Sequence, residues 1–440
     1  MLKRLPTINL RWFFWGVVFL LHIIFFFTQQ HQHYLPDSYE YAKEAYNLID
    51  HGVLYCGELD DSINFDLFTK RAPGYPALLA FCVQLFGSEL AIIGFQFLLS
   101  LFNILWVVKL LKLLEVSYRY RLTFFFLLLY PAQFMYVNWV MTEIFFQSCL
   151  LLMLASVIYW HKTENQTWLW VYLSAFLLGI FTKPVLYLFV LPSAGALLYL
   201  GWPRLRITLI CSVVIPFLTV GMYMQWNYQR TGFFHFSSIQ NLTLLHQATY
   251  QTLVSSQGPE KAEDIITFIE LTAAQKQSYG EEQEYIQKRV WAEIRNVPTT
   301  YTMLHVKGIL NFLLDTGRQD FFTSMGWDKQ IVGKWESRRT EDFWINLRDL
   351  SFGRMPPLLI ILIGNLLKIV GIGLFLRTSN ISKSLKWVLI GIPLYIAVMT
   401  GVLGSARFAV TVFPILTLCA IIGWSTVYAR WRNAFRLGEK

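Results

Sequence analysis

Repeated apolar runs of similar length constrain this chain more than any other feature of its sequence. A helix needs about 20 residues to cross the hydrocarbon core of a bilayer. Only 15% of the residues are charged, whereas soluble domains have about 25%. We therefore predict an all-α polytopic membrane protein with about ten transmembrane helices. The predicted spans are residues 12–27, 90–108, 122–137, 144–160, 168–181, 185–200, 207–226, 358–376, 387–403 and 408–428.

The positions of the basic residues predict the orientation of the chain in the membrane. Lys and Arg collect on the cytoplasmic side of membrane proteins, and Lys3, Arg4 and Arg11 precede the first predicted span. We therefore expect both termini in the cytoplasm and the loop 29–89 outside it. No small-residue cleavage site follows the first apolar run, so we expect an uncleaved span. This distribution also accounts for the net charge of +9, so no nucleic-acid partner is indicated.

The polar segments divide the chain into three parts. Residues after the seventh span are not apolar enough to cross a membrane, and they contain helical patterns near 260–271 and 281–295 and an amphipathic stretch at 301–314. We predict a small, mainly helical extracytoplasmic domain there. The expected parts are a transmembrane module at 1–226 that includes the first outer loop, the outer domain at 227–355, and C-terminal transmembrane helices at 356–440.

The first outer loop combines a surface helix with a short apolar segment. Residues 38–50 form an amphipathic pattern, and Gly52 follows where a C-cap belongs. Asp37 and Glu40 are spaced like a capping box at its start. The apolar piece 75–86 is too short to cross, so we predict an interfacial or re-entrant element. The apolar face of the surface helix is predicted to contain Tyr41, Ala42, Ala45, Leu48 and Ile49.

Five charged residues from separate parts of the sequence fall at the same predicted depth, the outer rim of the membrane. They are Asp37, Arg71, Glu143, Lys183 and Arg407. Ionisable groups at membrane depth are costly and are often functional. Two acids and three bases at one level predict a site for an anionic, membrane-borne substrate, and a lipid phosphate would suit the cations.

Each of these residues also has an ordinary structural explanation. The alternatives are Asp37 capping the surface helix, Arg71 snorkelling, Glu143 orienting its turn or pairing with a cation, and Lys183 and Arg407 anchoring lipid headgroups. Lys368 lies inside the eighth predicted span, where it could snorkel to the inner interface, and the sequence indicates no function for it.

A set of short motifs gives the sequence a resemblance to a known family. They are Asp37-Ser38-x-x-Tyr41 after the first span, Arg71-x-Pro73-Gly74-Tyr75-Pro76, Tyr130-Pro131 followed by Thr142-Glu143, Thr182-Lys183-Pro184, Asn227-Tyr228 followed by Ser237-Ser238 and Asn241-Leu242, and Arg407 followed by Pro414. In order and spacing, these motifs resemble the polyprenyl-phosphate-sugar-dependent glycosyltransferases of the GT-C superfamily. This group includes the bacterial relatives of protein O-mannosyltransferases and the lipid A aminoarabinose transferase. Lys183 stands where that family usually has Arg.

The resemblance implies an inverting transfer of a sugar from a polyprenyl-monophosphate donor to a lipid, glycan or protein acceptor. Asp37 would accept the acceptor's proton, or hold an acceptor that is itself anionic. Positioned cations stabilise developing negative charge. The residues implied to bind the donor phosphate are Arg71, Lys183 and Arg407. Those implied to support the site or bind substrate are Glu40, Tyr41, Tyr75 and Glu143. The location implied is the bacterial inner membrane, with the active site outside the cytoplasm.

The sequence predicts no metal and no other cofactor. The related oligosaccharyltransferases use a metal and an Asp-x-Asp motif, and the nearest equivalent here, Glu58-Leu59-Asp60-Asp61, is displaced from the start of the surface helix. The five cysteines contain no Cys-x-x-Cys pair, so neither a disulfide framework nor a zinc site is indicated.

Three alternatives stay open at this point: a polymerase or ligase of lipid-linked glycans, a lipid or glycan flippase, and a purely structural membrane protein. A structural protein would not need a carboxylate and cations at one level. Transporters place binding groups near the bilayer midplane and often contain inverted repeats, and the sequence shows neither feature.

Overall fold

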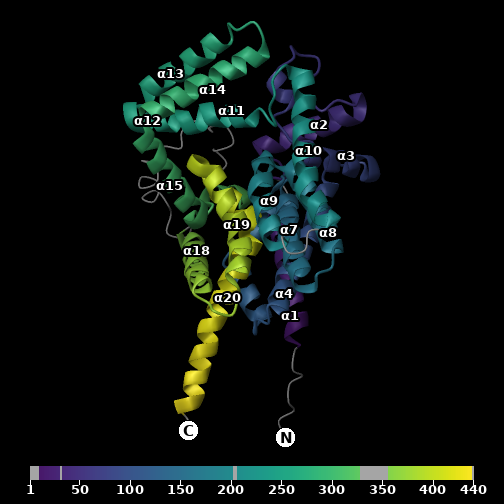
Figure 1. Ribbon diagram of the computed structural model, residues 1–440, viewed down its shortest axis with the longest axis vertical. Helices are drawn as coiled ribbons and strands as arrows, with labels where there is room; N and C mark the ends of the chain where they lie inside the picture. Colours follow the sequence, from purple (N-terminus) through teal and green to yellow (C-terminus); the bar gives the residue numbers. More distant parts are fainter. Residues whose placement is uncertain (1–8, 30–31, 202–205, 328–354, 439–440) are drawn as a thin grey trace.

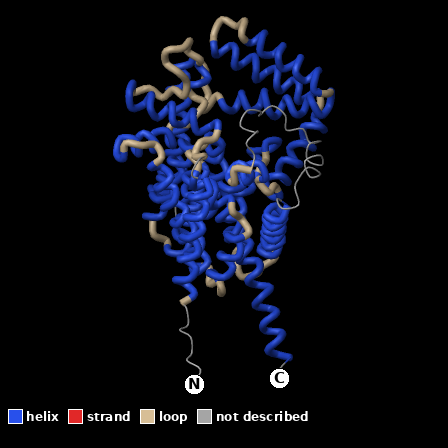
Figure 2. The backbone as a smooth tube through the Cα atoms, turned by 180° about the vertical axis from the view of Figure 1, so that it is seen from behind, coloured by secondary structure: helices blue, strands red, loops and turns tan. Residues whose placement is uncertain are grey.

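The computed structural model describes residues 9–29, 32–201, 206–327 and 355–438. These residues form helices joined by turns and loops, and no strand occurs among them (Figures 1 and 2). The prediction of an all-α polytopic membrane protein is confirmed. A bundle of apolar helices forms the body of the molecule, and a smaller group of helices lies at one end of it (Figure 1).

Eight of the ten predicted spans are helices long and apolar enough to cross a membrane. They are α1 (Leu10–Gln29), α4 (Ala91–Leu113), α7 (Glu143–Thr163), η3 with α9 (Pro184–Phe189 and Val190–Gly201), α10 (Ile207–Thr231), α18 (Met355–Leu376), α19 (Lys383–Thr400) and α20 (Ala406–Gly438). The count covers only the residues that the structure describes. Each span is identified by the length and the apolar composition of its helix.

The remaining two predicted spans differ from the others. The segment expected at 168–181 is α8 (Thr167–Thr182), which is apolar but has only 16 residues. The segment expected at 122–137 is not one helix. It is divided into α5 (Arg119–Leu128), α6 (Ala132–Met135) and the 3₁₀ turn η2 (Tyr136–Asn138). The break falls at Pro131, which lacks an N–H group and would clash with the preceding helical turn.

The apolar parts of two helices are enclosed by the rest of the bundle. In α7 and in α20, 78% of the most apolar window is buried, whereas the corresponding figure for α1 is 17%. Helix α7 packs against α4, α8 and α20, and these contacts form the main apolar core. The chain leading into α7 is buried as well, from residue 133 to residue 144. Side chains in the first turns of α7 and α20 are therefore held inside the bundle.

The segment between α1 and α4, which we predicted to lie outside the cytoplasm, contains the predicted surface helix and the predicted short apolar helix. The former is α2 (Pro36–His51), which ends at Gly52 with a φ of 67°. Its apolar face is buried against α3 (Gly74–Phe86), which has 13 residues, and the 3₁₀ turn η1 (Phe65–Phe68) lies between them in the sequence. The left-handed backbone at the helix end explains the glycine there.

The predicted capping box at the start of α2 is wrong. The helix begins two residues earlier than expected, with Leu35 at the N-cap and Pro36 at the first helical position, where proline is favoured. Ser38 Oγ accepts the backbone N–H of Leu35 at 2.9 Å. The carboxylates of Asp37 and Glu40 are therefore not used as caps, and they are available for other partners.

A separate group of helices follows α10. It contains α11 (Ile239–Thr243), the π-helical turn η5 (Leu244–Thr249), α12 (Tyr250–Gln257), α13 (Pro259–Ala273) and α14 (Tyr279–Asn296). We call residues 239–296 the cap domain; it has its own apolar core and lies at the top of Figure 1. The patterns at 260–271 and 281–295 correspond to α13 and α14. The end of the predicted outer domain, 328–354, lies outside the described residues.

Helix α15 (Pro298–Leu314), which corresponds to the stretch expected at 301–314, leads from the cap domain into the bundle (Figure 1). There it packs beside α18, α19 and α20. A short helix, α16 (Arg318–Ser324), follows it. The chain thus leaves the bundle after α10 and returns to it along α15.

Candidate functional site

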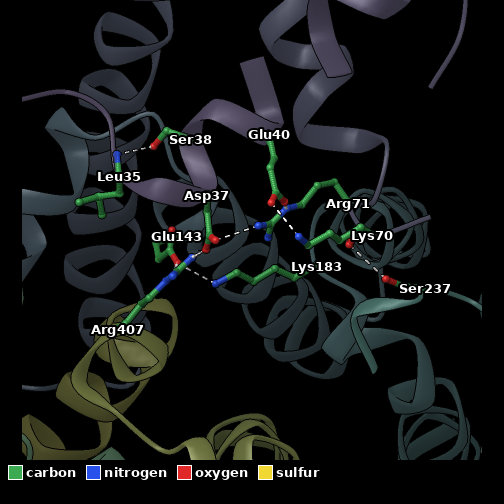
Figure 3. Close-up of polar contacts among 10 residues, drawn as sticks. All are labelled: Leu35, Asp37, Ser38, Glu40, Lys70, Arg71, Glu143, Lys183, Ser237 and Arg407. Carbon is green, nitrogen blue, oxygen red and sulfur yellow. Dashed lines mark hydrogen bonds and ion pairs between the residues drawn. The ribbon is translucent and has the colours of Figure 1, made fainter. Parts of the chain in front are cut away.

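Asp37 lies between two arginines that are far apart in the sequence. Its Oδ1 accepts a hydrogen bond from Arg71 Nη2 at 2.8 Å, and its Oδ2 accepts one from Arg407 Nη2 at 2.6 Å (Figure 3). Asp37 belongs to the first turn of α2, Arg71 to the loop before α3, and Arg407 to the first turn of α20. One carboxylate therefore joins the segment between α1 and α4 to α20.

The network continues from Arg71 to a second carboxylate on α2. Glu40 Oε2 accepts from Arg71 Nε at 2.7 Å, and Glu40 Oε1 accepts from Lys70 Nζ at 2.7 Å. Asp37 and Glu40 are three positions apart on a helix, so they lie on the same face. Both carboxylates can therefore bind the single guanidinium of Arg71, whose side chain is only 10% exposed.

A third carboxylate extends the network in the other direction. Glu143 Oε1 accepts from Arg407 Nε at 2.8 Å and from Lys183 Nζ at 2.9 Å (Figure 3). Its side chain is fully buried, and its Oε2 has no hydrogen-bond partner among the described residues. Glu143 is the first residue of α7, and Lys183 follows the last residue of α8. One buried oxygen thus holds two cations together.

A glycine explains how the loop carrying Arg71 reaches the end of α8. A Cβ atom added at Gly74 would lie 2.7 Å from the backbone oxygen of Phe181, which is closer than real Cβ contacts. Any side chain at position 74 would push the start of α3 away from α8. The glycine of the Arg-x-Pro-Gly motif therefore keeps Arg71 on the same side of the bundle as Lys183.

Two tyrosines, Tyr41 and Tyr75, pack beside the charged network. The guanidinium of Arg71 lies 4.8 Å from the centre of the Tyr41 ring, and Tyr75 packs edge-on against that ring at 5.1 Å. The hydroxyl of Tyr75 donates to Gln96 Oε1 at 3.0 Å, and Tyr75 is fully buried. Tyr41 therefore contacts the charged groups directly, whereas Tyr75 supports Tyr41. Whether either tyrosine binds substrate stays a prediction.

The site contains four cations and three carboxylates, which leaves one positive charge in excess. Burial alone would raise the pKa of Asp37, but the charges and hydrogen bonds of Arg407 and Arg71 outweigh it and hold that pKa well below its ordinary value. Asp37 is therefore ionised at every physiological pH. The excess positive charge favours binding of an additional anion at this site.

The structure brings together the charged residues that the sequence placed at one depth. Asp37, Arg71, Glu143, Lys183 and Arg407 form one connected network, and Glu40 belongs to it (Figure 3). Their catalytic and binding roles stay predictions.

Sequence reasoning did not assign the pairing partners of Glu40. Glu40 has two partners, Arg71 and Lys70. Sequence reasoning missed Lys70, whose only signal was its position beside Arg71. Lys368 lies apart from this network. Its Nζ is 3.9 Å from the centre of the Tyr130 ring and 4.9 Å from that of Phe413.

Metal binding has no positive support in the described part of the chain. No three side chains among its His, Cys, Asp and Glu residues are grouped so that they could hold an ion. The three acids of the network, Asp37, Glu40 and Glu143, have Arg and Lys as partners instead. The absence of a metal requirement stays a prediction.

Comparisons with known proteins give only distant likenesses. No protein-family model and no curated protein matches the chain. Among solved structures it is similar to the archaeal oligosaccharyltransferase AglB from Archaeoglobus fulgidus in complex with an inhibitory peptide and a dolichol-phosphate. The identity is 11% and the TM-score 0.48, over 98% of this chain and 52% of AglB. This chain thus corresponds to about half of AglB.

A second similar structure is ArnT from Cupriavidus metallidurans bound to undecaprenyl phosphate. The identity is 12% and the TM-score 0.35, over 94% of this chain and 77% of ArnT. The same protein in the apo state gives 13% identity and a TM-score of 0.33.

Glu143 should be the most important of the three carboxylates for stability. Changing Glu143 to Gln leaves Arg407 and Lys183 with a neutral partner in a buried position, which we expect to cost about 3 kcal/mol. The free energy of unfolding in mixed detergent micelles measures this. Adding Lys183→Met should recover part of the loss, because one unpaired cation is removed. The exposed Glu263→Gln on α13 serves as control and should be neutral; a similar loss there would contradict the assignment.

The burial of Glu44 leads to a prediction of how the stability of the protein depends on pH. It is buried on α2, and its Oε2 has no hydrogen-bond partner among the described residues. Burial raises the pKa of Glu44 to about 8, although Arg71 and Arg230 act in the opposite direction. Between the ordinary pKa of 4.5 and about 8, the folded protein keeps a proton that the unfolded chain has lost. Stability should therefore fall as pH rises through this window.

The glutamine in the variant Glu44→Gln does not titrate, so the stability of this variant should not fall between pH 5 and pH 8. We expect the melting temperature of the wild type to drop by several degrees relative to the variant between pH 5 and pH 8. Thermal unfolding in detergent at both pH values measures the difference. Parallel pH profiles for the two proteins would show that Glu44 does not titrate in this range.

Proposed function

We propose that this protein is an inverting glycosyltransferase, which moves a sugar from a polyprenyl-monophosphate donor to an acceptor. The observation that carries the proposal is the position of Asp37. Its carboxylate lies between the guanidinium groups of Arg71, in the loop before α3, and Arg407, in the first turn of α20. A carboxylate beside several cations provides both functions that this reaction needs. The cations bind and stabilise a phosphate leaving group, and the carboxylate accepts a proton.

In the proposed reaction, the hydroxyl oxygen of the acceptor attacks the anomeric carbon of the donor sugar. The bond between that carbon and the phosphate oxygen breaks on the opposite side, which inverts the anomeric centre. The leaving phosphate keeps the electron pair, and its negative charge is balanced by Arg71, Arg407 and Lys183. The proton of the acceptor hydroxyl passes to Asp37. The polyprenyl chain of the donor stays among the apolar surfaces of the membrane helices.

The charge balance of the site favours a coupled order of events. Asp37 is a weak base while two guanidinium groups hold it, because they lower its pKa. A donor phosphate that binds Arg71 and Arg407 competes with Asp37 for their N–H groups. Losing those hydrogen bonds raises the proton affinity of Asp37. We therefore propose that Asp37 becomes an effective base only when the donor is bound.

We further propose that the site faces the extracytoplasmic side of a bacterial inner membrane. The support is the orientation predicted from the basic residues that flank the apolar segments. The start of α1 and the end of α20 lie at the opposite end of the molecule from the cap domain (Figure 1). The cap domain would then be the part that meets the acceptor, since surface elements on a fixed scaffold usually provide specificity.

Replacing Asp37 with Asn tests both parts of the proposal. Sugar transfer should fall by about 10²–10⁴-fold, the typical contribution of a general base. Binding of undecaprenyl phosphate, measured with the purified protein in detergent, should become tighter, because Asn no longer competes with the phosphate for Arg71 and Arg407. Asp50→Asn, an exposed acid in the last turn of α2, is the matched control and should change neither quantity. Full transfer by the Asp37→Asn protein would exclude Asp37 as the base.

The proposal also predicts that transfer needs no divalent metal. The cations that balance the leaving phosphate are side chains, so adding an excess of EDTA should leave the initial rate of sugar transfer unchanged. The measurement compares rates with EDTA, without it, and with added Mg²⁺ or Mn²⁺. Loss of activity with EDTA that returns on adding a metal would contradict the prediction.

A further inference from the structure

The start of α20, which carries Arg407, is held by a residue from the end of α15. Asp315 Oδ2 accepts the backbone N–H of Ala406 at 2.9 Å, and its Oδ1 accepts the backbone N–H of Gly317 at 3.0 Å. Ala406 directly precedes Arg407. A carboxylate at a helix N-terminus satisfies a free N–H group and is favoured by the helix dipole. The first turn of α20 is therefore fixed in place by the end of α15.

Helix α15 also contacts the turn that leads into α20. A Cβ atom at Gly308 would lie 1.8 Å from the backbone oxygen of Gly401, and one at Gly404 would lie 1.8 Å from the backbone oxygen of Gly308. The two backbones therefore touch, and glycine is required at the crossing. One turn earlier, His305 Nε2 donates to the backbone oxygen of Val398 at 2.9 Å. A shift of α15 must move this turn and the residues that follow it.

The lower end of α15 is attached to α18. Asn365 Nδ2 donates to the backbone oxygens of Leu314 and Asp315 at 3.3 and 3.1 Å. Asn365 is buried. Only Val297 separates the upper end of α15 from α14 of the cap domain. The helix is thus a direct connection between the cap domain and the position of Arg407.

The segment before Arg71, the other arginine that binds Asp37, is also held by residues at or near the cap domain. Ser237 Oγ donates to the backbone oxygen of Lys70 at 3.2 Å. The Thr69 hydroxyl donates to His235 Nε2 at 2.7 Å, since His235 Nδ1 lies 2.8 Å from the backbone oxygen of Phe233 and donates to it. Tyr279 of α14 donates its hydroxyl proton to Asp66 Oδ1 at 2.7 Å. The chain entering the cap domain therefore fixes the segment before Arg71, as the chain leaving it fixes Arg407.

We propose that Asp315 is a positioning residue for Arg407, and that the cap domain sets the geometry of the phosphate-binding cations through α15. The inference rests on the proposed function, because it assigns a role within the same phosphate site. Asp315 touches neither Arg407 nor the other charged groups of the network by hydrogen bond or ion pair, so it acts through the backbone of α20.

The test measures binding of undecaprenyl phosphate to the full chain in detergent. Asp315→Ala removes the acceptor for the Ala406 N–H and should weaken binding about fivefold, which corresponds to the loss of one helix cap. Asp315→Asn keeps an acceptor oxygen and should restore binding to within about twofold of the wild type. The matched control is Ser382→Ala, which removes the cap of α19, where Ser382 Oγ accepts from Leu385 N. It should lower the melting temperature without changing the affinity.

A double-mutant cycle separates positioning from general stability. When Arg407 is already replaced by Ala, Asp315→Ala should weaken binding no further, because the group that it positions is absent. Additive effects would overturn the proposal. Asn365→Leu provides a milder change at the same junction if Asp315→Ala does not fold. It should weaken binding about threefold in the wild type and not at all in the Arg407→Ala protein.

The controls distinguish a failure of the proposed function from a failure of the positioning role of Asp315. If the wild type does not bind undecaprenyl phosphate, or if Arg407→Ala does not weaken binding, the proposed function fails. If both of those results hold but Asp315→Ala and Asn365→Leu bind as tightly as the wild type, only the positioning role fails.

Discussion

The ion pairs of one carboxylate with two guanidinium groups determine how the ends of the bundle come together. Asp37 binds Arg71 and Arg407, and these three residues come from α2, the following loop and the last membrane helix. A single charge beside an apolar environment is unfavourable, whereas a paired and hydrogen-bonded one is tolerated. Asp37, Arg71 and Arg407 are each stabilised by pairing, so the three segments that carry them have to come together. The same requirement that orders the fold also assembles the site.

Much of this arrangement could be predicted from the sequence, because hydropathy and basic flanks fix the depth of a residue in the membrane. Depth alone was enough to group Asp37, Arg71 and Arg407 at one level. Depth does not say which residues around the bundle face one another, so the individual pairs could not be assigned. The break at Pro131 was missed because the apolar pattern continues across it, although proline rarely fits inside a helix. The start of α2 was misplaced by two residues for a similar reason, since a helix starting at either position places the same apolar residues on one face.

The cap domain shows a different limit of sequence reasoning. Its helices α13 and α14 follow from their periodic apolar residues, which pack into a separate core. Its attachment to the site depends on single hydrogen bonds, such as those of Thr69 with His235 and of Asp315 with the start of α20. Isolated polar residues of this kind leave no periodic signal. The connection between the cap domain and the two arginines becomes visible only in three dimensions.

The shared oxygen of Glu143 has a thermodynamic consequence for any anion that enters the site. Long basic side chains normally lose rotamer freedom when they bind a ligand, and that loss reduces affinity. Here Lys183 and Arg407 are already immobilised by Glu143 during folding. An arriving anion meets donors whose ordering was completed in advance, so more of its interaction energy remains as affinity. Glu143 thus holds Lys183 and Arg407 in fixed positions before any anion binds.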